Sequence, residues 1–227
     1  MSKLLHCCLI LMTLITPGLM ADELKLPPLF ADHMVLQRDL PLKVWGQAKA
    51  GQQLEVELAQ SKTNVTADAK GQWLATLKPQ AAGGPYQLTI SSKEQKISFT
   101  DVWLGDVWVA SGQSNMEWKL GAQTENWQQE VQDSQLPKIR FYTLPKTLSA
   151  LSNQPVPEAS WIKASPETVA DFSAIGWFFA KQNHLQKGVA VGIIDATWGG
   201  TAAEAWTPAQ ALLTVPGYEK DAADMQA

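Results

Sequence analysis

Cysteine is almost absent from this 227-residue sequence, and its scarcity excludes several kinds of chemistry. The two cysteines, Cys7 and Cys8, lie in an apolar segment at residues 4–19, which we expect to be cleaved from the mature protein. The mature chain then has no disulfide, no thiol nucleophile and no cysteine ligand for a metal. Its stability must therefore come from buried apolar surface.

The first 21 residues have the layout of a secretory signal peptide. Lys3 precedes the apolar segment, and the small residue Ala21 stands directly before the acidic pair Asp22-Glu23. The segment is short and wrongly flanked for a membrane span, and no later segment is long and apolar enough to be one. We therefore expect an exported protein, periplasmic or extracellular, with no membrane span in the mature chain.

Basic clusters are missing as well. The formal net charge is −4, and no group of lysines and arginines resembles a phosphate-binding surface, so nucleic acid is not an expected partner. The sequence also lacks a metal-spaced set of ligands and a glycine-rich phosphate loop, so we predict no metal and no cofactor. Ten tryptophans are many for this length, but tryptophan fills cores as often as it stacks on sugars.

Alternating apolar and polar residues between Met34 and about Leu104 predict short antiparallel strands. In residues 54–58, leucine and valine alternate with glutamate, the period-2 pattern of a half-buried strand. Ala69-Lys70-Gly71 has the composition of a hairpin turn. We predict a small antiparallel β-sandwich over residues 22–100.

The pattern changes after Thr100, where apolar strands alternate with helical segments. Strands are predicted to begin at Asp106, Lys138 and Val189, and the stripe of Phe172, Ile175 and Phe179 predicts a helix ending at Lys187-Gly188. This order predicts a parallel α/β sheet covered on both faces, over residues 101–227. Three strands are fewer than the roughly five of a doubly wound sheet. The predicted fold class is thus an incomplete α/β domain preceded by a β-sandwich.

The segment VASGQSNMEW, residues 109–118, places a serine just past a predicted strand. Gly112 permits a sharp turn, and Ser114 then stands at the start of the following helix, where backbone N–H groups favour an oxyanion. Serine is also a preferred helix cap. The pattern alone leaves both interpretations open, a nucleophile for acyl transfer and a cap, and it is not the Gly-x-Ser-x-Gly elbow of common lipases.

Four segments carry a resemblance to a known family. LGDVWVASGQSNMEWKL, together with LFADHMVLQRDLPLKVWGQA near the start and FSAIGWFFAKQNH and VGIIDATWGGTAAEAW later, resembles the sialate O-acetylesterase family of SGNH-type hydrolases. The resemblance runs along nearly the whole mature chain. It implies a β-sandwich preceding an SGNH-type α/β hydrolase domain, and a cofactor-free enzyme that removes acetyl esters from sialic acid or other acetylated carbohydrates.

The resemblance also implies roles for individual residues. Ser114 resembles the family nucleophile and supplies its own N–H to the oxyanion hole, and Gly200 resembles the residue that supplies a second N–H. The alternative for Gly199-Gly200 is a tight turn with no catalytic part. The positions that we expect to shape or support the pocket are Gln113, Asn115, Gly199, Thr201, Glu204 and Trp206.

A catalytic base is what the sequence does not supply. The family places an Asp-x-x-His motif near its C-terminal end, and this chain has none. Of its three histidines, His6 lies in the signal peptide, and we expect His33 to be structural and His184 to lie on the surface of a helix.

These observations lead to one leading prediction and two alternatives. We predict a sialate O-acetylesterase that acts through Ser114. The alternatives are a truncated, catalytically inactive sugar-binding remnant, and an acetylesterase for another acetylated glycan such as xylan. A carboxylate pair drawn from Asp101, Asp106 and Asp195, as in glycoside hydrolysis, has less support because sequence does not give its separation.

Overall fold

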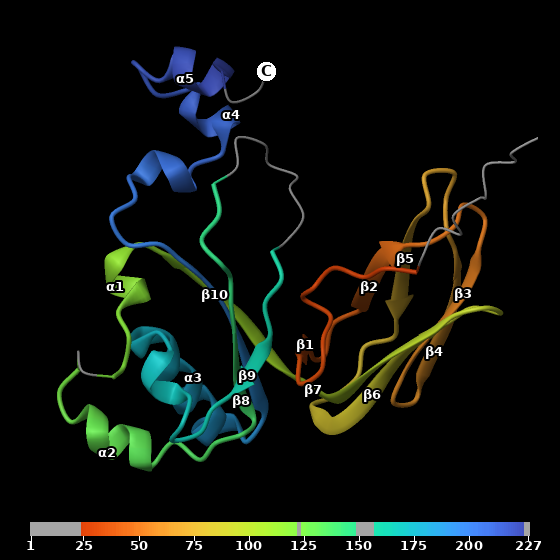
Figure 1. The fold of residues 1–227 in the computed structure, drawn as a ribbon, viewed down its shortest axis with the longest axis horizontal. Coiled ribbons are helices and arrows are strands. Elements are labelled where there is room, and N and C mark those ends of the chain that lie inside the picture. The colour runs from red at the N-terminus through yellow and green to blue at the C-terminus, as the bar shows by residue number, and fades with distance from the viewer. Residues whose placement is uncertain (1–23, 122–123, 149–156, 225–227) are drawn as a thin grey trace, which may run out of the picture.

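The computed structural model describes residues 24–121, 124–148 and 157–224, so the predicted signal peptide lies outside the described residues. Figure 1 shows a β-sandwich beside a mixed α/β part, with one long strand, β7 (Lys96–Gly112), crossing between them. In the ranges just given, every helix is too short or too polar to cross a bilayer.

The sandwich forms where the alternating sequence predicted strands. Its strands are β1 (Val35–Gln37), β2 (Leu42–Gln47), β3 (Gln53–Leu58), β4 (Ser61–Thr66), β5 (Gln72–Leu77) and β6 (Gly83–Ser91). Strands β4, β3, β6 and β7 pair antiparallel in that order, while β2 and β5 form a separate two-stranded sheet. The alternate residues Leu54, Val56 and Leu58 are buried, as their period predicts.

The predicted hairpin at Ala69-Lys70-Gly71 is wrong in one respect. A tight turn forms there, with the N–H of Gly71 donating to the carbonyl of Asp68. The strands on either side, however, belong to different sheets, since β4 pairs with β3 and β5 pairs with β2. The turn therefore connects the two layers of the sandwich. Local sequence specifies such a turn but not the partner of each strand.

The α/β part contains the three strands predicted from the sequence and one that was missed. Its elements are β8 (Ile139–Thr143), β9 (Trp161–Lys163), β10 (Ala190–Thr197), α1 (Ser114–Glu117), α2 (Trp127–Gln132), α3 (Ala174–Lys187), α4 (Ala209–Leu212), α5 (Glu219–Asp224) and the 3₁₀ turns Val169–Asp171 and Ala203–Trp206. Strand β10 pairs parallel with β7 on one side and with β8 on the other. The missed strand, β9, pairs antiparallel with β8.

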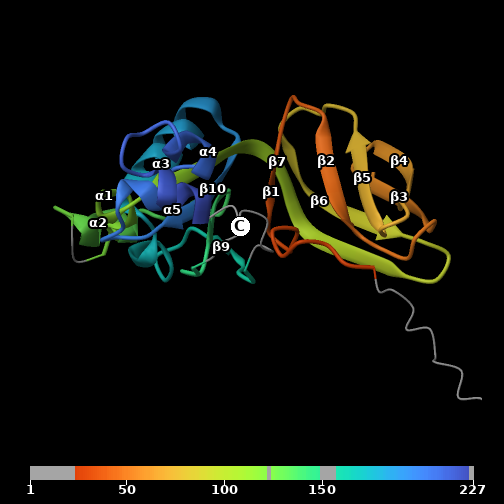
Figure 2. The same cartoon turned by 90° about the horizontal axis from the view of Figure 1, so that it is seen from above.

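Strand β7 belongs to both parts. Its first half pairs antiparallel with β6, and its residues from Gly105 onward pair parallel with β10. Figure 2 shows it as one continuous curved strand. The predicted division between residues 100 and 101 falls inside this strand, so the backbone of the sandwich leads directly into the sheet that carries Ser114.

Helix α3 ends at Lys187, with Gly188 at φ 70° as its C-cap, as predicted, but the apolar stripe that predicted the helix is not its buried face. Ile175 and Phe179 are exposed, whereas Ala174, Trp177 and Ala180 are buried. Small residues allow the helix to approach the sheet closely: a Cβ added to Gly176 would lie 3.1 Å from a ring carbon of Phe141. The packed face therefore combines small residues with one large ring, that of Trp177.

The two faces of the parallel sheet are covered differently. Helix α3 covers the face that carries Phe141 and Ile193. The opposite face, with Tyr142 and Trp161, is buried against the sandwich core and the N-terminal segment, where the Trp161 indole N–H donates to the carbonyl of Leu29 at 2.9 Å. The expected covering of both faces is therefore observed, with a helix on only one of them.

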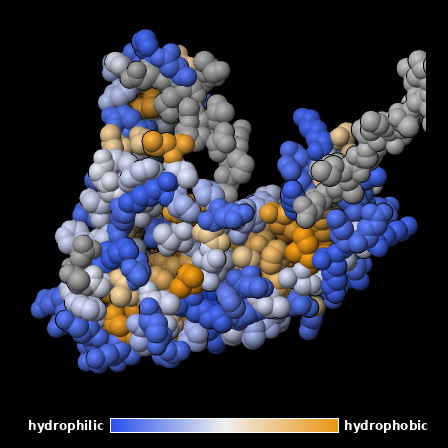
Figure 3. Space-filling model, in the orientation of Figure 1, coloured by the Kyte–Doolittle hydropathy of each residue, from blue (hydrophilic) through white to orange (hydrophobic). Residues whose placement is uncertain are grey.

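Apolar side chains remain exposed around the outer edge of β7 and α3. Among the described strands, residues 106–112 pair only with β10, and the rings of Trp108 and Phe179 meet edge to face at 5.0 Å while both remain more than one-third exposed. The face of the molecule in Figure 3 is mainly hydrophilic, with apolar residues gathered near the junction of the two parts.

A buried cation connects the two parts at this junction. Arg140 on β8 is 2% exposed, and its guanidinium donates to the carbonyls of His33 and Asp101 and to the Asp101 carboxylate. Burial alone would raise the pKa of Asp101, but hydrogen bonds from Lys163, Trp103, His33 and Arg140 outweigh it and hold the pKa far below its ordinary value. The carboxylate thus stays charged and paired.

We predict that Arg140→Met lowers the free energy of unfolding by about 3–5 kcal/mol, because it leaves buried carbonyls without a donor and Asp101 without its buried partner. Urea unfolding at neutral pH measures the loss. The control is Lys43→Met on β2, an exposed position that should change stability by less than about 0.5 kcal/mol. Equal stability of Arg140→Met and the wild type would show that the network does not hold the junction together.

Candidate active site

The two segments singled out in the sequence meet at the carboxyl edge of the sheet. Strands β7 and β10 are parallel and in register to their ends, with Gly112 opposite Thr197. The N–H of Trp198 then donates to the carbonyl of Gly112 at 2.9 Å. SGQSNM and WGGT therefore leave neighbouring strands at the same edge, where open α/β sheets bind their ligands.

Ser114 is the first residue of the short helix α1, and Gln113 occupies the cap position. The interpretation of Ser114 as the helix cap is therefore wrong. Its hydroxyl is exposed and lies 3.2 Å from the Gln113 side-chain oxygen. Gly112, at φ 136°, provides the turn out of β7 that the sequence predicted. This placement leaves the hydroxyl accessible to a ligand.

The Gly199–Gly200 turn packs against the Ser114 helix. A Cβ added to Gly199 would lie 3.4 Å from the Cα of Ser114 and only 2.8 Å from a carboxylate oxygen of Glu117. Gly200 has φ 81°, a left-handed conformation that favours glycine. The predicted nucleophile and the predicted oxyanion segment are thus brought together.

Glu117 is the residue at this site that sequence reasoning missed. Its carboxylate accepts the N–H of Gly199 and pairs with Lys146, which lies after β8. The Lys146 ammonium and the Gly199 N–H lower the pKa of Glu117, so the side chain is ionised at neutral pH. The only sequence signal was its position one helical turn after Ser114.

The opposite end of α1 is attached to the start of α3. Ser173, the N-cap of α3, accepts the N–H of Gly176 at 3.1 Å and donates its hydroxyl to the carbonyl of Met116. The N–H of Ala174 also donates to the carbonyl of Trp118 at 2.7 Å. The serine-bearing turn is therefore held by a packed helix as well as by its own strand.

A buried carboxyl lies beneath the site on β10. Asp195 is 5% exposed and accepts a hydrogen bond from the Thr197 hydroxyl at 2.7 Å. The pKa of Asp195 is raised above its ordinary value, mainly by burial and further by the nearby charge of Glu117. Hydrogen bonds from Thr197 and Thr143 oppose this shift only in part.

The remaining predicted pocket residues lie around the two turns. Thr201 donates its hydroxyl to the carbonyl of Trp198 and accepts the indole N–H of Trp206, both at 2.7 Å, which braces the turn after β10. The Glu204 carboxylate accepts a hydrogen bond from the Tyr218 hydroxyl. Asn115 is exposed on α1. Trp206 and Glu204 thus support the loop, as the sequence predicted.

Neither described histidine lies where a base for Ser114 is needed. The His184 ring bonds the carbonyl of Val189, at the start of β10, about 25 Å along the strand from the carboxyl edge. His33 bonds Asp101, about 35 Å along β7 from Gly112. His184 is partly buried beside the α3–β10 turn rather than simply exposed, and both histidines have structural partners.

The aspartates do not form a catalytic pair. Asp101 belongs to the Arg140 network, and Asp106 is buried with Arg38 and Lys187. Asp195 lies on the neighbouring strand β10 with threonine partners. Within the portion of the chain that the structure describes, no group of histidine, cysteine and acidic residues is arranged to hold a metal ion.

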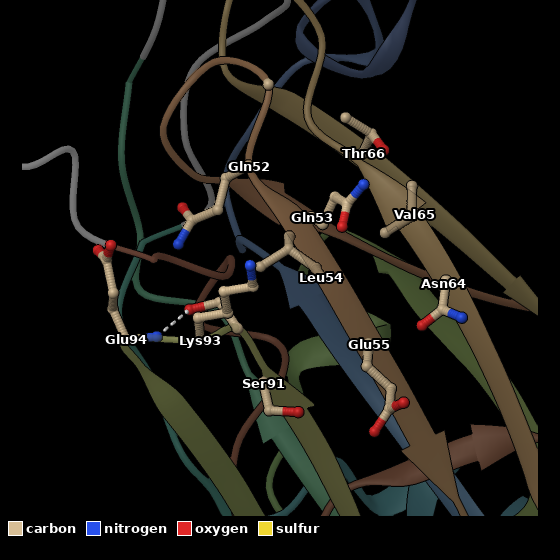
Figure 4. Close-up of a pocket in the computed structure, with 12 residues that line it drawn as sticks. Gln52, Gln53, Leu54, Glu55, Asn64, Val65, Thr66, Ser91, Lys93 and Glu94 are labelled. Carbon is tan, nitrogen blue, oxygen red and sulfur yellow. Dashed lines mark hydrogen bonds between the residues drawn. The ribbon is translucent and has the colours of Figure 1, made fainter.

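A separate hollow of about 810 Å³ lies on the sandwich, away from all the predicted site residues. Figure 4 shows its lining, mainly polar side chains from β3, β4 and the turn between β6 and β7. The Ser92 hydroxyl accepts the N–H of Glu94 at 3.2 Å. Its lining includes Gln52 and Asn64 and none of the residues that the sequence predicted for the site.

Comparison with known proteins identifies the α/β part. Residues 104–220 match the carbohydrate esterases described as sialic acid-specific acetylesterases, a range that contains β10, α1 and both glycine turns. The chain belongs to this family. A carbohydrate acetylesterase from Xanthomonas citri has the same fold, with a TM-score of 0.81 and 39% identity over 85% of this chain and 44% of its own. The predicted fold class is thereby confirmed.

The curated relatives include sialate O-acetylesterases of mammals. The rat protein is 28% identical over 200 residues, and the human protein is 29% identical over 201 residues. Each alignment covers 80% of this chain. The chain spans 37% of the rat protein and 38% of the human protein, so it corresponds to well under half of either relative.

We predict that Ser173→Ala lowers the free energy of unfolding by about 1–2 kcal/mol, because α3 loses its cap and α1 loses a hydrogen bond to its backbone. Thermal unfolding followed by circular dichroism measures the change. Ser160→Ala, at an exposed position before β9, is the matched control and should be neutral. A neutral Ser173→Ala variant would mean that the serine does not connect α1 to α3.

Proposed function

We propose that this protein is a carbohydrate O-acetylesterase in which Ser114 attacks the acetyl carbonyl. The observation that carries the proposal is the contact between the Ser114 helix and the Gly199–Gly200 turn at the carboxyl edge of the sheet. Family membership and the solved acetylesterase with the same fold support the same reaction.

The proposed oxyanion hole consists of the backbone N–H groups of Ser114 and Gly200. The N–H of Gly199 is already used by Glu117, whereas the N–H of Gly200 donates to no residue that the structure describes. Preorganised N–H groups stabilise the negative charge that develops on the acetyl oxygen. Gln113, Asn115 and Thr201 border this position and are proposed to shape the pocket.

The base that takes the Ser114 proton lies outside the described residues in this proposal, because His33, before β1, and His184, on α3, are both far from Ser114. A histidine oriented by a carboxylate is the usual partner of a serine nucleophile. Attack forms an acetyl–Ser114 ester and releases the sugar hydroxyl, and water then releases acetate and restores the serine. The proposed reaction uses no cofactor.

The proposed substrate is an acetyl ester of sialic acid. This choice is supported by the family description and by the names of the rat and human relatives. The Xanthomonas citri relative is named more broadly, as a carbohydrate acetylesterase. Acetylated xylan is therefore the second substrate to test.

A second candidate function is sugar binding without catalysis by this chain. It is favoured by one observation, that neither described histidine is near Ser114. The reading frame after codon 227 separates the two candidates, because an encoded Asp-x-x-His motif provides the base and a stop codon does not.

We also propose that the protein is exported after cleavage near Ala21, which is supported by the charged, apolar and small-residue pattern of residues 1–21. We expect mass spectrometry of the protein purified from the native host to show a chain that begins at Asp22. A chain that retains Met1 or Ser2 would overturn the proposal of export.

The proposed reaction predicts that Ser114→Ala lowers acetate release by more than about 1000-fold, because it removes the nucleophile. The measurement compares wild type and variant, each expressed with any Asp-x-x-His motif that the reading frame encodes after codon 227, on O-acetylated sialic acid and on acetylated xylan. Glu125→Gln, an exposed change nearby in sequence, is the control and should retain activity.

The two outcomes have distinct meanings. Wild-type activity that survives in Ser114→Ala would exclude Ser114 as the nucleophile. No acetate from either substrate would overturn the esterase proposal for this chain and favour sugar binding without catalysis, which calorimetry with the same sugars would then detect.

A further inference from the structure

We propose that Glu117 is a positioning residue, whose carboxylate holds the N–H of Gly199 and thereby sets the place of the Gly199–Gly200 turn relative to Ser114. The effect of Glu117 on catalysis rests on the proposed function. The hydrogen bond between Glu117 and the Gly199 N–H can be tested without an activity. The proposal gives a function to a charged side chain that neither the family match nor the serine mechanism assigns.

The first argument is the geometry of the contact. Glu117 and Ser114 are the two ends of the four-residue helix α1, and Gly199 packs against both of them. A hydrogen bond to Glu117 therefore fixes the glycine turn to the same helix that carries the nucleophile. Since Gly200 follows directly, its N–H is placed by the same contact.

The second argument is that the carboxylate is itself held in place. Lys146 pairs with Glu117, and its ammonium lies 5.8 Å from the centre of the Trp198 ring. Lys146 thus touches both sides of the contact, the helix and the residue before the glycine turn. Charged donors and acceptors form stronger hydrogen bonds than neutral ones, so the Gly199 N–H has a strong acceptor.

The third argument separates positioning from proton transfer. The carboxylate of Glu117 already accepts from Lys146 and Gly199, and these two partners lower its pKa. A carboxylate with a lowered pKa is a poor general base at neutral pH. The other charged groups that face it are Lys119 on the chain just after α1 and Asp195 on β10. Glu117 is therefore suited to hold a backbone group.

The structural test is nuclear magnetic resonance of the Gly199 amide. At neutral pH we expect its proton resonance, deshielded by a charge-assisted bond, to move upfield in Glu117→Ala. In the wild type the resonance should also move as the pH falls, with a midpoint below 4.5, and this movement should vanish in Glu117→Gln. Glu125→Gln removes one charge elsewhere and should leave both behaviours unchanged.

The kinetic test uses acetate release by the same variants. A displaced oxyanion donor should lower kcat of Glu117→Ala by about 10–100-fold with KM changed by less than about 2-fold. Glu117→Gln retains an oxygen that can accept the Gly199 N–H, so we expect it to recover part of the rate. Thermal unfolding of each variant distinguishes misplacement from loss of the fold.

The outcomes keep the two proposals apart. A Gly199 resonance that is indifferent to Glu117 overturns the positioning proposal, whether or not the protein is an esterase. An active wild type with unchanged kcat in a folded Glu117→Ala variant also overturns it. If the wild type releases no acetate, the proposed function fails, and the resonance of Gly199 alone decides the role of Glu117.

Discussion

The pairing of strand β7 is the constraint on which the rest of this structure depends. The same strand completes the sandwich sheet through β6 and begins the parallel sheet through β10. The position of Ser114, two residues past its end, is therefore determined by the packing of both parts. The Arg140 and Asp101 contacts reinforce this arrangement, since they connect β8 to the backbone of β7 and of the segment before β1.

The candidate site follows from that pairing in a short series of steps. Parallel strands end at one edge, so the turns after β7 and β10 must be neighbours. Gly112 and Gly200 have positive φ angles that permit these turns, and Gly199 lies against Ser114. Glu117 then converts a close approach into a charged hydrogen bond. The proposed oxyanion hole thus consists of backbone groups, which a rigid sheet can hold accurately.

The family relationship and the structure describe complementary parts of the proposed enzyme. The matched residues include the proposed nucleophile and the proposed oxyanion segment, and the chain spans less than half of its mammalian relatives. The exposed edge of β7, with Trp108 and Phe179 beside it, lies on the same sheet. In the described chain, the proposed nucleophile and the proposed oxyanion donors lie together, and neither described histidine lies beside Ser114.

Much of the fold was predictable because it depends on local periodicity. The alternation in β3, the apolar runs of β8 and β10, and the glycine that ends α3 all act within a few residues. Predictions failed where a choice of neighbour was needed. The turn near Gly71 joins different sheets, and α3 buries alanines and Trp177 rather than Ile175 and Phe179. In both cases the deciding contact is with a distant segment.

The same distinction applies to the site. The sequence by itself determined that a serine and a glycine pair follow two strands, since a strand, a turn residue and a helix start are local features. Only the tertiary structure decided that Gln113 is the cap, that the two histidines lie elsewhere, and that Glu117 holds Gly199. That last bond joins residues 82 positions apart. Its existence depends on the register of β7 and β10, which no local pattern specifies.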